Sequence, residues 1–285
     1  MDRPMHSKIC MVTGATSGIG AVTAHVLAQQ GATVIVVGRD AAKSAATVNH
    51  IKQQTGNLAV EFMLADLSSQ KEIHQLAQQF TSRYQRLHVL VNNAGALFTA
   101  RQQSVDGIEM TFALNHLNYF LLTDLLLDTL NASAPARIVN VGASAHQFAR
   151  RVNFDDLQGQ RKYSAWGAYG QSKLCNLLFT YELARRLDGT GVTVNALHPG
   201  VVATNFGMSG GGLMPLFNRL MSIAMLRPER GAQTVLYLAA SPEVEGVSGK
   251  YFVNQKAVRS SKASYDQSAA DRLWQVSAAM CGLSA

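Results

Sequence analysis

The sequence is poor in cysteine, proline and charge. Of its 285 residues, three are cysteine and six are proline, and charged residues make up 15%, against about 25% in an average globular domain. Cys10, Cys175 and Cys281 are far apart and odd in number, which argues against a disulfide framework and against a cysteine-based metal site. We therefore expect a cytoplasmic protein from a reducing compartment, with no bound metal.

Long hydrophobic runs are also lacking. The most apolar stretch, 119–127, contains Asp124 and is far shorter than the about 20 residues needed to span a bilayer. Residues 1–12 have no apolar core of the length found in signal peptides. We expect neither a leader nor a membrane anchor.

Charge of one sign is in modest excess. Lys and Arg number 25 against 18 Asp and Glu, a net charge of +7, and the basic residues are spread along the chain rather than gathered in a stripe. This distribution argues against nucleic acid as a ligand, although it favours attraction of a polyanionic cofactor. Hydrophobic residues make up 47%, which excludes intrinsic disorder.

The sequence does contain an alternation of strand-like and helix-like segments. Apolar runs of strand length occur at 9–13, 33–37, 59–64, 88–91, 137–141, 192–197 and 250–253. Between them, apolar residues recur every three or four positions, most clearly in 110–125 and 174–184, as on the buried face of a helix. Apolar strands without polar alternation are typical of a parallel sheet covered on both faces. The pattern predicts an α/β fold, a doubly wound parallel sheet with helices on both faces, in a single domain over 1–285.

Spaced glycines follow the first predicted strand. The run TGATSGIG, 13–20, leads into a helix that we expect to begin near Ile19. At such a junction glycines let the backbone approach a pyrophosphate, which is stabilised at the helix N-terminus. The residues expected to bind this part of a dinucleotide are Gly14, Ser17, Gly18, Ile19 and Gly20.

Gly38, Arg39 and Asp40 follow the second predicted strand. A site that prefers NAD usually places an acid here to hydrogen-bond the ribose 2′-hydroxyl. Glycine removes that carboxylate, and a guanidinium can bind a 2′-phosphate with two donors. We therefore expect NADP(H), with Arg39 at the 2′-phosphate and Asp40 capping the next helix. A strand end one or two residues later would restore the NAD interpretation.

Tyr169 and Lys173 are four residues apart at the start of a predicted amphipathic helix, so their side chains share one face. An adjacent ammonium stabilises a phenolate and lowers the phenol pKa from its ordinary value of about 10. Such a phenol suits the proton transfer that accompanies hydride transfer at a carbonyl. Because surface pairs show the same spacing, the pair alone leaves catalytic and structural interpretations open.

Taken together, the motifs resemble those of the short-chain dehydrogenase/reductase family. Besides the glycine run and the Tyr169–Lys173 pair, they include Asp66, the run 92–95 (NNAG), and Pro199-Gly200 with Thr204. The segments that resemble the retinol-dehydrogenase-like branch are 106–110, 114–117, 157–159, 179–187 and 272–274. The resemblance implies a Rossmann fold and a hydride transfer between NADP(H) and a carbonyl/alcohol pair.

The resemblance also implies roles for individual residues. Tyr169 is the implied proton donor and acceptor, and Lys173 is implied to lower its pKa and to hold the nicotinamide ribose. Asn115 is implied to support a water-linked proton path to Lys173, whereas we expect Asn92 to satisfy backbone groups between strands. The other implied cofactor contacts are Asp66 and Leu67 at the adenine, Asn93, Ala94 and Gly95 on the adenosine side, and Val202 and Thr204 at the carboxamide.

One position departs from the family pattern. The family's strand usually ends in Val-Ser-Ser, whose second serine hydrogen-bonds the substrate oxygen, whereas 141–144 here is VGAS. Aligned on the following Ala145, the serine position holds Ala143; aligned back from Tyr169, it holds Ser144. We expect Ser144 to take the role, because no other hydroxyl is close and a one-residue bulge at a strand end is tolerated.

The segment 205–228 interrupts the alternation, with glycines at 210–212 among Met, Leu and Phe. We interpret it as an apolar lid over the substrate, hinged at those glycines; the alternative is a loop with a short helix that covers the core. Its apolar side chains favour an aliphatic, aromatic or isoprenoid aldehyde or ketone over a charged metabolite. A retinal-like substrate is implied by the branch resemblance alone.

The alternative function is that of a dinucleotide-binding regulator or scaffold, a protein that has the same fold but does not catalyse hydride transfer. Such a protein need not keep Tyr169 and Lys173, and their presence favours the enzyme. The resemblance also implies a homo-oligomer paired through helices that correspond to 110–130 and 169–187. The connection 145–168 is longer than in the shortest family members and could obstruct that surface.

Overall fold

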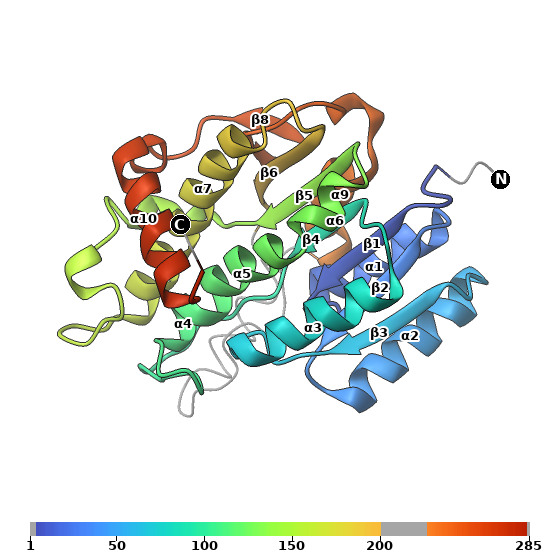
Figure 1. Cartoon of the computed structure of the whole chain (residues 1–285), viewed down its shortest axis with the longest axis horizontal. Helices are drawn as coiled ribbons and strands as arrows, with labels where there is room; N and C mark the ends of the chain where they lie inside the picture. Colours follow the sequence, from blue (N-terminus) through green and yellow to red (C-terminus); the bar gives the residue numbers. More distant parts are fainter. Residues whose placement is uncertain (1–3, 201–226, 284–285) are drawn as a thin grey trace.

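The computed structural model describes residues 4–200 and 227–283. In this part of the chain, one sheet of eight strands in the order β3-β2-β1-β4-β5-β6-β7-β8 forms the middle layer of the molecule (Figure 1). The first seven strands pair in parallel, and β8 runs antiparallel to β7. The strands are β1 (Ile9–Thr13), β2 (Thr33–Gly38), β3 (Val60–Leu64), β4 (Val89–Asn92), β5 (Ala136–Val141), β6 (Val192–His198), β7 (Tyr251–Val253) and β8 (Lys256–Val258).

Helices cover both faces of the sheet, which confirms the predicted doubly wound α/β fold. One face carries α1 (Gly18–Gln29), α2 (Ala41–Thr55) and α9 (Pro228–Ala240). The other carries α3 (Gln70–Arg83), α5 (Asn118–Leu125) and α7 (Ala165–Arg186), with α10 (Gln267–Met280) packed on α7. The short helices are α4 (Met110–Phe112) and α6 (Leu127–Asn131).

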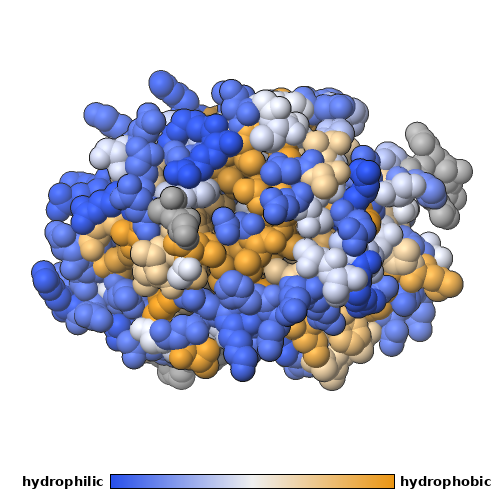
Figure 2. All heavy atoms as spheres, in the orientation of Figure 1, coloured by the Kyte–Doolittle hydropathy of each residue, from blue (hydrophilic) through white to orange (hydrophobic). Residues whose placement is uncertain are grey.

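The strands are apolar because both of their faces are buried. In β1, Met11 packs into the cluster that contains α3, α5 and α7, whereas Cys10 and Val12 pack into the cluster that contains α1, α2 and α9. Successive side chains of a strand point to opposite faces, so most positions of a doubly covered strand are apolar. Polar side chains cover most of the face seen in Figure 2, with apolar atoms visible between them towards the middle.

Two elements differ from the prediction. The edge strand β8 was not expected, and its three residues are all exposed, so no buried position marks it in the sequence. The predicted continuous helix over 110–125 is interrupted by a π-helical turn, η1 (Ala113–Leu117), between α4 and α5. This turn contains Asn115, which is fully buried. Such π turns are frequent at functional sites.

All three cysteines are free and buried. Burial raises the pKa of Cys10 and of Cys281 to about 12 and also raises that of Cys175. Their sulfurs therefore pack as small apolar groups. In the ranges 4–200 and 227–283, no helix has both the length and the apolar character required to traverse a bilayer.

Candidate active site

Most of the described site residues follow the carboxyl ends of the parallel strands β1, β2, β3, β4 and β5, whereas Asn115, Tyr169 and Lys173 lie in helices. The strand order turns back on itself at β1, whose neighbours are β2 on one side and β4 on the other. In open α/β sheets, ligands bind outside the carboxyl ends of the strands at such a switch point. The fold therefore brings the predicted motifs to one edge of one sheet.

The glycine loop after β1 is closely packed against the end of β4. A side-chain carbon at Gly14 would lie 2.9 Å from Ala94 Cα, and one at Gly20 would lie 2.5 Å from the carbonyl oxygen of Gly14. Thr13 Oγ1 accepts hydrogen bonds from the amides of Asn93 (2.8 Å) and Ala94 (3.0 Å). Gly14 also has φ +62°, a conformation that favours glycine. Each of these positions requires the absence of a side chain.

The N-terminus of α1 is open to an anion. Its N-cap, Ser17, makes no side-chain capping bond, and the first turn has no acidic residue. The first amides of a helix lack intrahelical partners and carry partial positive charge. An uncapped helix that begins at a glycine loop fits a pyrophosphate, and the site residues therefore suit a dinucleotide.

The end of β2 closes the other side of the glycine loop. A side-chain carbon at Gly38 would lie 2.6 Å from Thr16 Cγ2, so a larger residue here would displace the Thr16 side chain. Asp40 Oδ1 accepts a hydrogen bond from the Lys43 amide (3.0 Å) and caps α2, as predicted. Arg39 is exposed and makes no ion pair with a described residue.

Asp66 and Leu67 follow β3. Asp66 Oδ1 accepts hydrogen bonds from the amide (2.9 Å) and hydroxyl (2.7 Å) of Ser68, which leaves Oδ2 for other donors. Leu67 is buried in the core, so only its backbone could contact a nucleotide. On β4, Asn92 donates to the side chains of Thr123 (3.0 Å) and Asn140 (2.9 Å). The expectation that Asn92 satisfies backbone groups is therefore wrong, because its amide bridges side chains of β5 and α5.

Tyr169 and Lys173 lie side by side and buried in the first half of α7. The helix begins at Ala165, earlier than predicted, capped by Ser164. The Lys173 ammonium lies 5.7 Å from the centre of the Tyr169 ring, and it donates to the carbonyl of Val141 (3.0 Å), the last residue of β5. The pair is thus held at the carboxyl end of the central strands.

Burial perturbs both groups. It raises the pKa of the Tyr169 phenol above its usual value of 10.0 and lowers the pKa of the Lys173 ammonium to about 7. The direction for Tyr169 is opposite to the prediction, because burial removes the solvation that stabilises a phenolate. The phenol is therefore protonated at neutral pH.

Asn115 lies next to Lys173. A side-chain carbon at Gly95 would lie 3.0 Å from Asn115 Oδ1 and 3.6 Å from Lys173 Nζ. The Asn115 amide group bonds both backbone groups of Ala96, accepting at 2.8 Å and donating at 2.9 Å. Its own carbonyl accepts from Asn176 Nδ2 at 2.8 Å. Asn115 thus joins the loop after β4 to α7.

The turn after β5 is held by two histidines. Ser144 begins a 3₁₀ helix, η2 (Ser144–Phe148); its side chain is exposed, and its amide donates to His198 Nδ1 (3.3 Å). His146 lies 2.7 Å from the Ala143 carbonyl through Nδ1 and accepts from the Ser261 amide (3.2 Å) through Nε2. Ala143, by contrast, packs against the apolar cluster that includes Tyr169. Ala143 therefore packs against the Tyr169 cluster, whereas Ser144, which has the hydroxyl, does not.

Two predicted site residues are not described by the structure, and two residues near the site were not predicted. Val202 and Thr204 lie outside the described residues, as does the predicted lid up to 226. The sequence reasoning missed His198 and Tyr119, whose ring lies 5.6 Å from the Lys173 ammonium. The signal for Tyr119 was its position four residues after Asn115, within the most apolar stretch of the chain.

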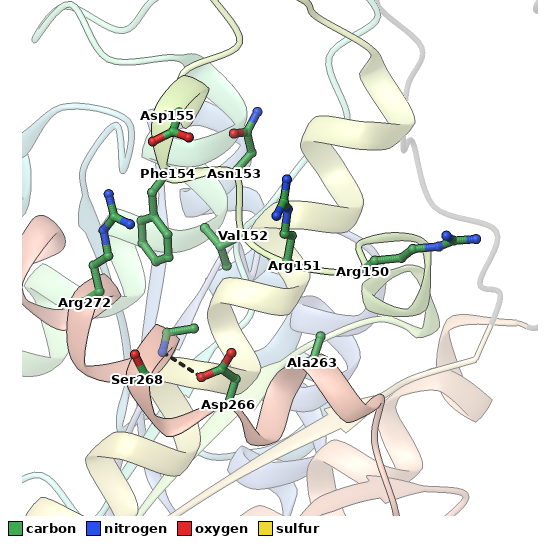
Figure 3. Close-up of a pocket in the computed structure, with 11 residues that line it drawn as sticks. Arg150, Arg151, Val152, Asn153, Phe154, Asp155, Ala263, Asp266, Ser268 and Arg272 are labelled. Carbon is green, nitrogen blue, oxygen red and sulfur yellow. Dashed lines mark hydrogen bonds between the residues drawn. The ribbon is translucent and has the colours of Figure 1, made fainter.

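A separate hollow of about 310 Å³ lies between the loop 150–155 and the start of α10 (Figure 3). None of the predicted site residues lines it. Its three arginines, Arg150, Arg151 and Arg272, extend in different directions and do not converge on one point (Figure 3). This hollow is thus distinct from the candidate active site.

Comparisons with known proteins agree with this geometry. A family model described as short chain dehydrogenase matches residues 8–210. The chain is 43% identical to retinol dehydrogenase 12 of Mus musculus, over 97% of this chain and 87% of the relative, and 44% identical to retinol dehydrogenase 13 of Homo sapiens, over 98% and 86%.

Solved structures show the same similarity. An uncharacterised protein from Mycobacterium paratuberculosis matches with a TM-score of 0.80 and 32% identity, over 98% of this chain and 95% of that chain. A short chain dehydrogenase from Shigella flexneri in complex with NADP matches with a TM-score of 0.68 and 26% identity, over 90% of this chain and 100% of that chain.

Proposed function

Because the chain belongs to the short chain dehydrogenase family, in its retinol-dehydrogenase-like branch, we propose that it uses NADP(H) to interconvert a carbonyl and an alcohol on an apolar substrate. The observation that carries the proposal is the buried Tyr169–Lys173 pair, beside a glycine loop and an uncapped helix at the same sheet edge. A bound NADP(H) supplies or accepts the hydride.

Tyr169 is the proposed proton donor for reduction. Burial keeps its phenol protonated, which is the form that can give a proton to a carbonyl oxygen as the carbon is reduced. The charged form of Lys173 stabilises the phenolate that remains, because an opposite charge nearby favours ionisation. Asn115 holds the loop after β4 against α7 and is the proposed link of the proton path to Lys173.

The second donor to the substrate oxygen is the proposed role of Ser144, the hydroxyl of the turn after β5. Its exposed position makes the expected contribution smaller than that of a buried donor. Val202 and Thr204 remain proposed contacts of the nicotinamide carboxamide.

The proposed preference for NADP(H) rests on Gly38 and Arg39. β2 ends at Gly38, which has no carboxylate, and the Asp40 carboxylate caps α2. The Arg39 guanidinium makes no ion pair with a described residue. The similar Shigella flexneri enzyme is itself a complex with NADP.

Arg39→Ala tests this preference. We expect KM for NADPH to rise about 20-fold, because one charge-assisted contact is lost, and KM for NADH to stay within about twofold. Arg150→Ala, at another exposed arginine, is the matched control. Equal effects of Arg39→Ala on the two cofactors would refute the phosphate contact.

The proposed substrate is an apolar aldehyde or ketone. Besides Lys173, Tyr169 has apolar neighbours: Leu97, Ala143 and Ala145 pack in its cluster, and the exposed Trp166 ring lies 6.1 Å from the Tyr169 ring. The relatives named retinol dehydrogenases suggest an isoprenoid substrate.

A panel of aldehydes and ketones with NADPH tests the activity. We expect Tyr169→Phe to lower kcat by about 10³-fold or more, because the variant has no proton to give, while the dissociation constant of NADPH changes less than about threefold. NADPH binding without turnover of any substrate by the wild type would instead favour a dinucleotide-binding regulator.

A further inference from the structure

The Lys173 ammonium has few polar neighbours. Its side chain is 3% exposed, its one hydrogen-bond acceptor among the described residues is the Val141 carbonyl (3.0 Å), and no described carboxylate is within ion-pair distance. A buried ammonium without a carboxylate loses much of its solvation. In the part of the chain that the structure describes, the contacts of this ammonium are a backbone oxygen and two aromatic rings.

Tyr119 provides such a face. Its ring is fully buried, and the ring centre lies 5.6 Å from Lys173 Nζ, as near as the 5.7 Å of Tyr169. Its hydroxyl donates to the same Val141 carbonyl, at 3.4 Å. Tyr119 from α5 and Lys173 from α7 therefore meet at one oxygen, at the end of β5. A cation near an aromatic face is attracted to it, and more strongly when both are desolvated.

Within 4–200 and 227–283, no carboxylate forms an ion pair with this ammonium. The titratable side chains whose rings face the ammonium are Tyr119 from α5 and Tyr169 from α7. From β5, the Val141 carbonyl accepts the hydrogen bond of the ammonium; the side-chain amide of Asn115 in η1 is bonded to Ala96 and Ser172 instead. Tyr169 is proposed to change its protonation during turnover, whereas Tyr119 is buried and its phenol stays protonated. Of the two tyrosines that face the ammonium, Tyr119 is thus the one whose protonation does not change.

We propose that Tyr119 is a positioning residue for Lys173: its ring face holds the ammonium beneath the Val141 carbonyl, and its hydroxyl fixes the orientation of the ring. The consequence for turnover rests on the proposed function, whereas the position of the ammonium does not. Tyr119 does not contact the reacting atoms in this assignment.

The test compares Tyr119→Leu, which removes the ring, with Tyr119→Phe, which keeps it. Phe120→Leu is the matched control, because Phe120 is a buried aromatic on the same helix that packs on Phe179 and Trp274. If Tyr119→Leu does not fold, Tyr119→Phe is compared with 3,5-difluorophenylalanine at position 119. The fluorines weaken the ring face and leave its shape nearly unchanged.

Two measurements apply to each variant. The first is the pKa of Lys173, followed by NMR in protein labelled at lysine Cε and assigned with Lys173→Met. The second is the pH profile of NADPH-dependent carbonyl reduction. We expect Tyr119→Leu to lower the Lys173 pKa by about one unit and to move the alkaline limb of the profile down by the same amount. The difluoro ring should produce part of this shift, and Phe120→Leu should produce none.

The outcomes separate this proposal from the proposed function. If Tyr119→Leu and Phe120→Leu lose the same activity with the Lys173 pKa unchanged, Tyr119 is only a packing residue and the proposal is wrong. If the wild type turns over no carbonyl, the proposed function fails, and the NMR titration alone still decides whether Tyr119 holds the ammonium.

Discussion

The turns after β1 and after β5 lie at the same edge of the sheet but are held in place by different means. The turn after β1 is fixed by missing side chains, since Gly14 and Gly20 allow contacts that a Cβ would block. The turn after β5 is fixed by side chains from distant parts of the chain, with His198 bound to Ser144 and His146 bound to Ser261. A turn of the first kind depends on local sequence, whereas a turn of the second kind depends on the completed fold.

Gly20→Ala should break the first turn and have the largest effect on stability. The added carbon would lie 2.5 Å from the Gly14 carbonyl oxygen and 2.6 Å from Asn93 Nδ2, so the backbone must move. We expect a loss of about 3 kcal/mol in the free energy of unfolding, measured with urea.

Gly167→Ala is the control for that change. Gly167 lies in the first turn of α7, and a side-chain carbon there would meet nothing nearer than 3.4 Å. We expect no loss, and a gain of up to about 1 kcal/mol from helix propensity. Equal losses in the two variants would show that the glycine loop is not sterically fixed.

Lys173→Met tests the turn after β5, because it removes the ammonium that donates to the carbonyl of Val141, the last residue of β5. Burial lowers the Lys173 pKa from 10.5 to about 7 in the folded protein. The unfolded chain therefore binds more protons between these values, and this lysine makes wild-type stability rise with pH over that window. The variant lacks this cost and should be more stable by about 2 kcal/mol near pH 7, with the difference fading towards about pH 10. Unfolding curves at several pH values measure it, and a constant difference would contradict the burial argument.

Ser144→Ala should have the smallest effect. Its side chain is exposed, and we expect kcat to fall about fivefold, equivalent to about 1 kcal/mol. Ala143→Ser is the informative partner, because it places a hydroxyl at the residue that packs against the Tyr169 cluster. An unchanged kcat in Ser144→Ala together with a higher kcat in Ala143→Ser would assign the serine position to residue 143.

The contrast between features set by local sequence and features set by the completed fold also explains what could be predicted from the sequence. The strands from β1 to β7 were placed to within one or two residues, because burial on both faces leaves continuous apolar runs. The glycine loop and the Asp40 cap were also predicted, since both depend on neighbouring residues. The edge strand β8 has no buried position and left no pattern.

The rest required contacts between residues far apart in the chain. The π turn contains Asn115, which bonds Ala96 in the loop after β4, and the bridge from Asn92 follows from its position opposite Asn140. The pKa direction of Tyr169 was predicted wrongly because spacing on a helix shows a neighbouring charge but not the depth of burial. The sequence showed that Tyr169 and Lys173 are neighbours on a helix, but it did not show that both are removed from solvent.

Burial of the three free thiols protects them from oxidants. Only a thiolate reacts readily with peroxide or an alkylating reagent, and the raised pKa values of Cys10, Cys175 and Cys281 leave almost no thiolate at neutral pH. The sulfurs become reactive when the surrounding core opens. Oxidative damage at cysteine is therefore limited by conformational opening of the fold.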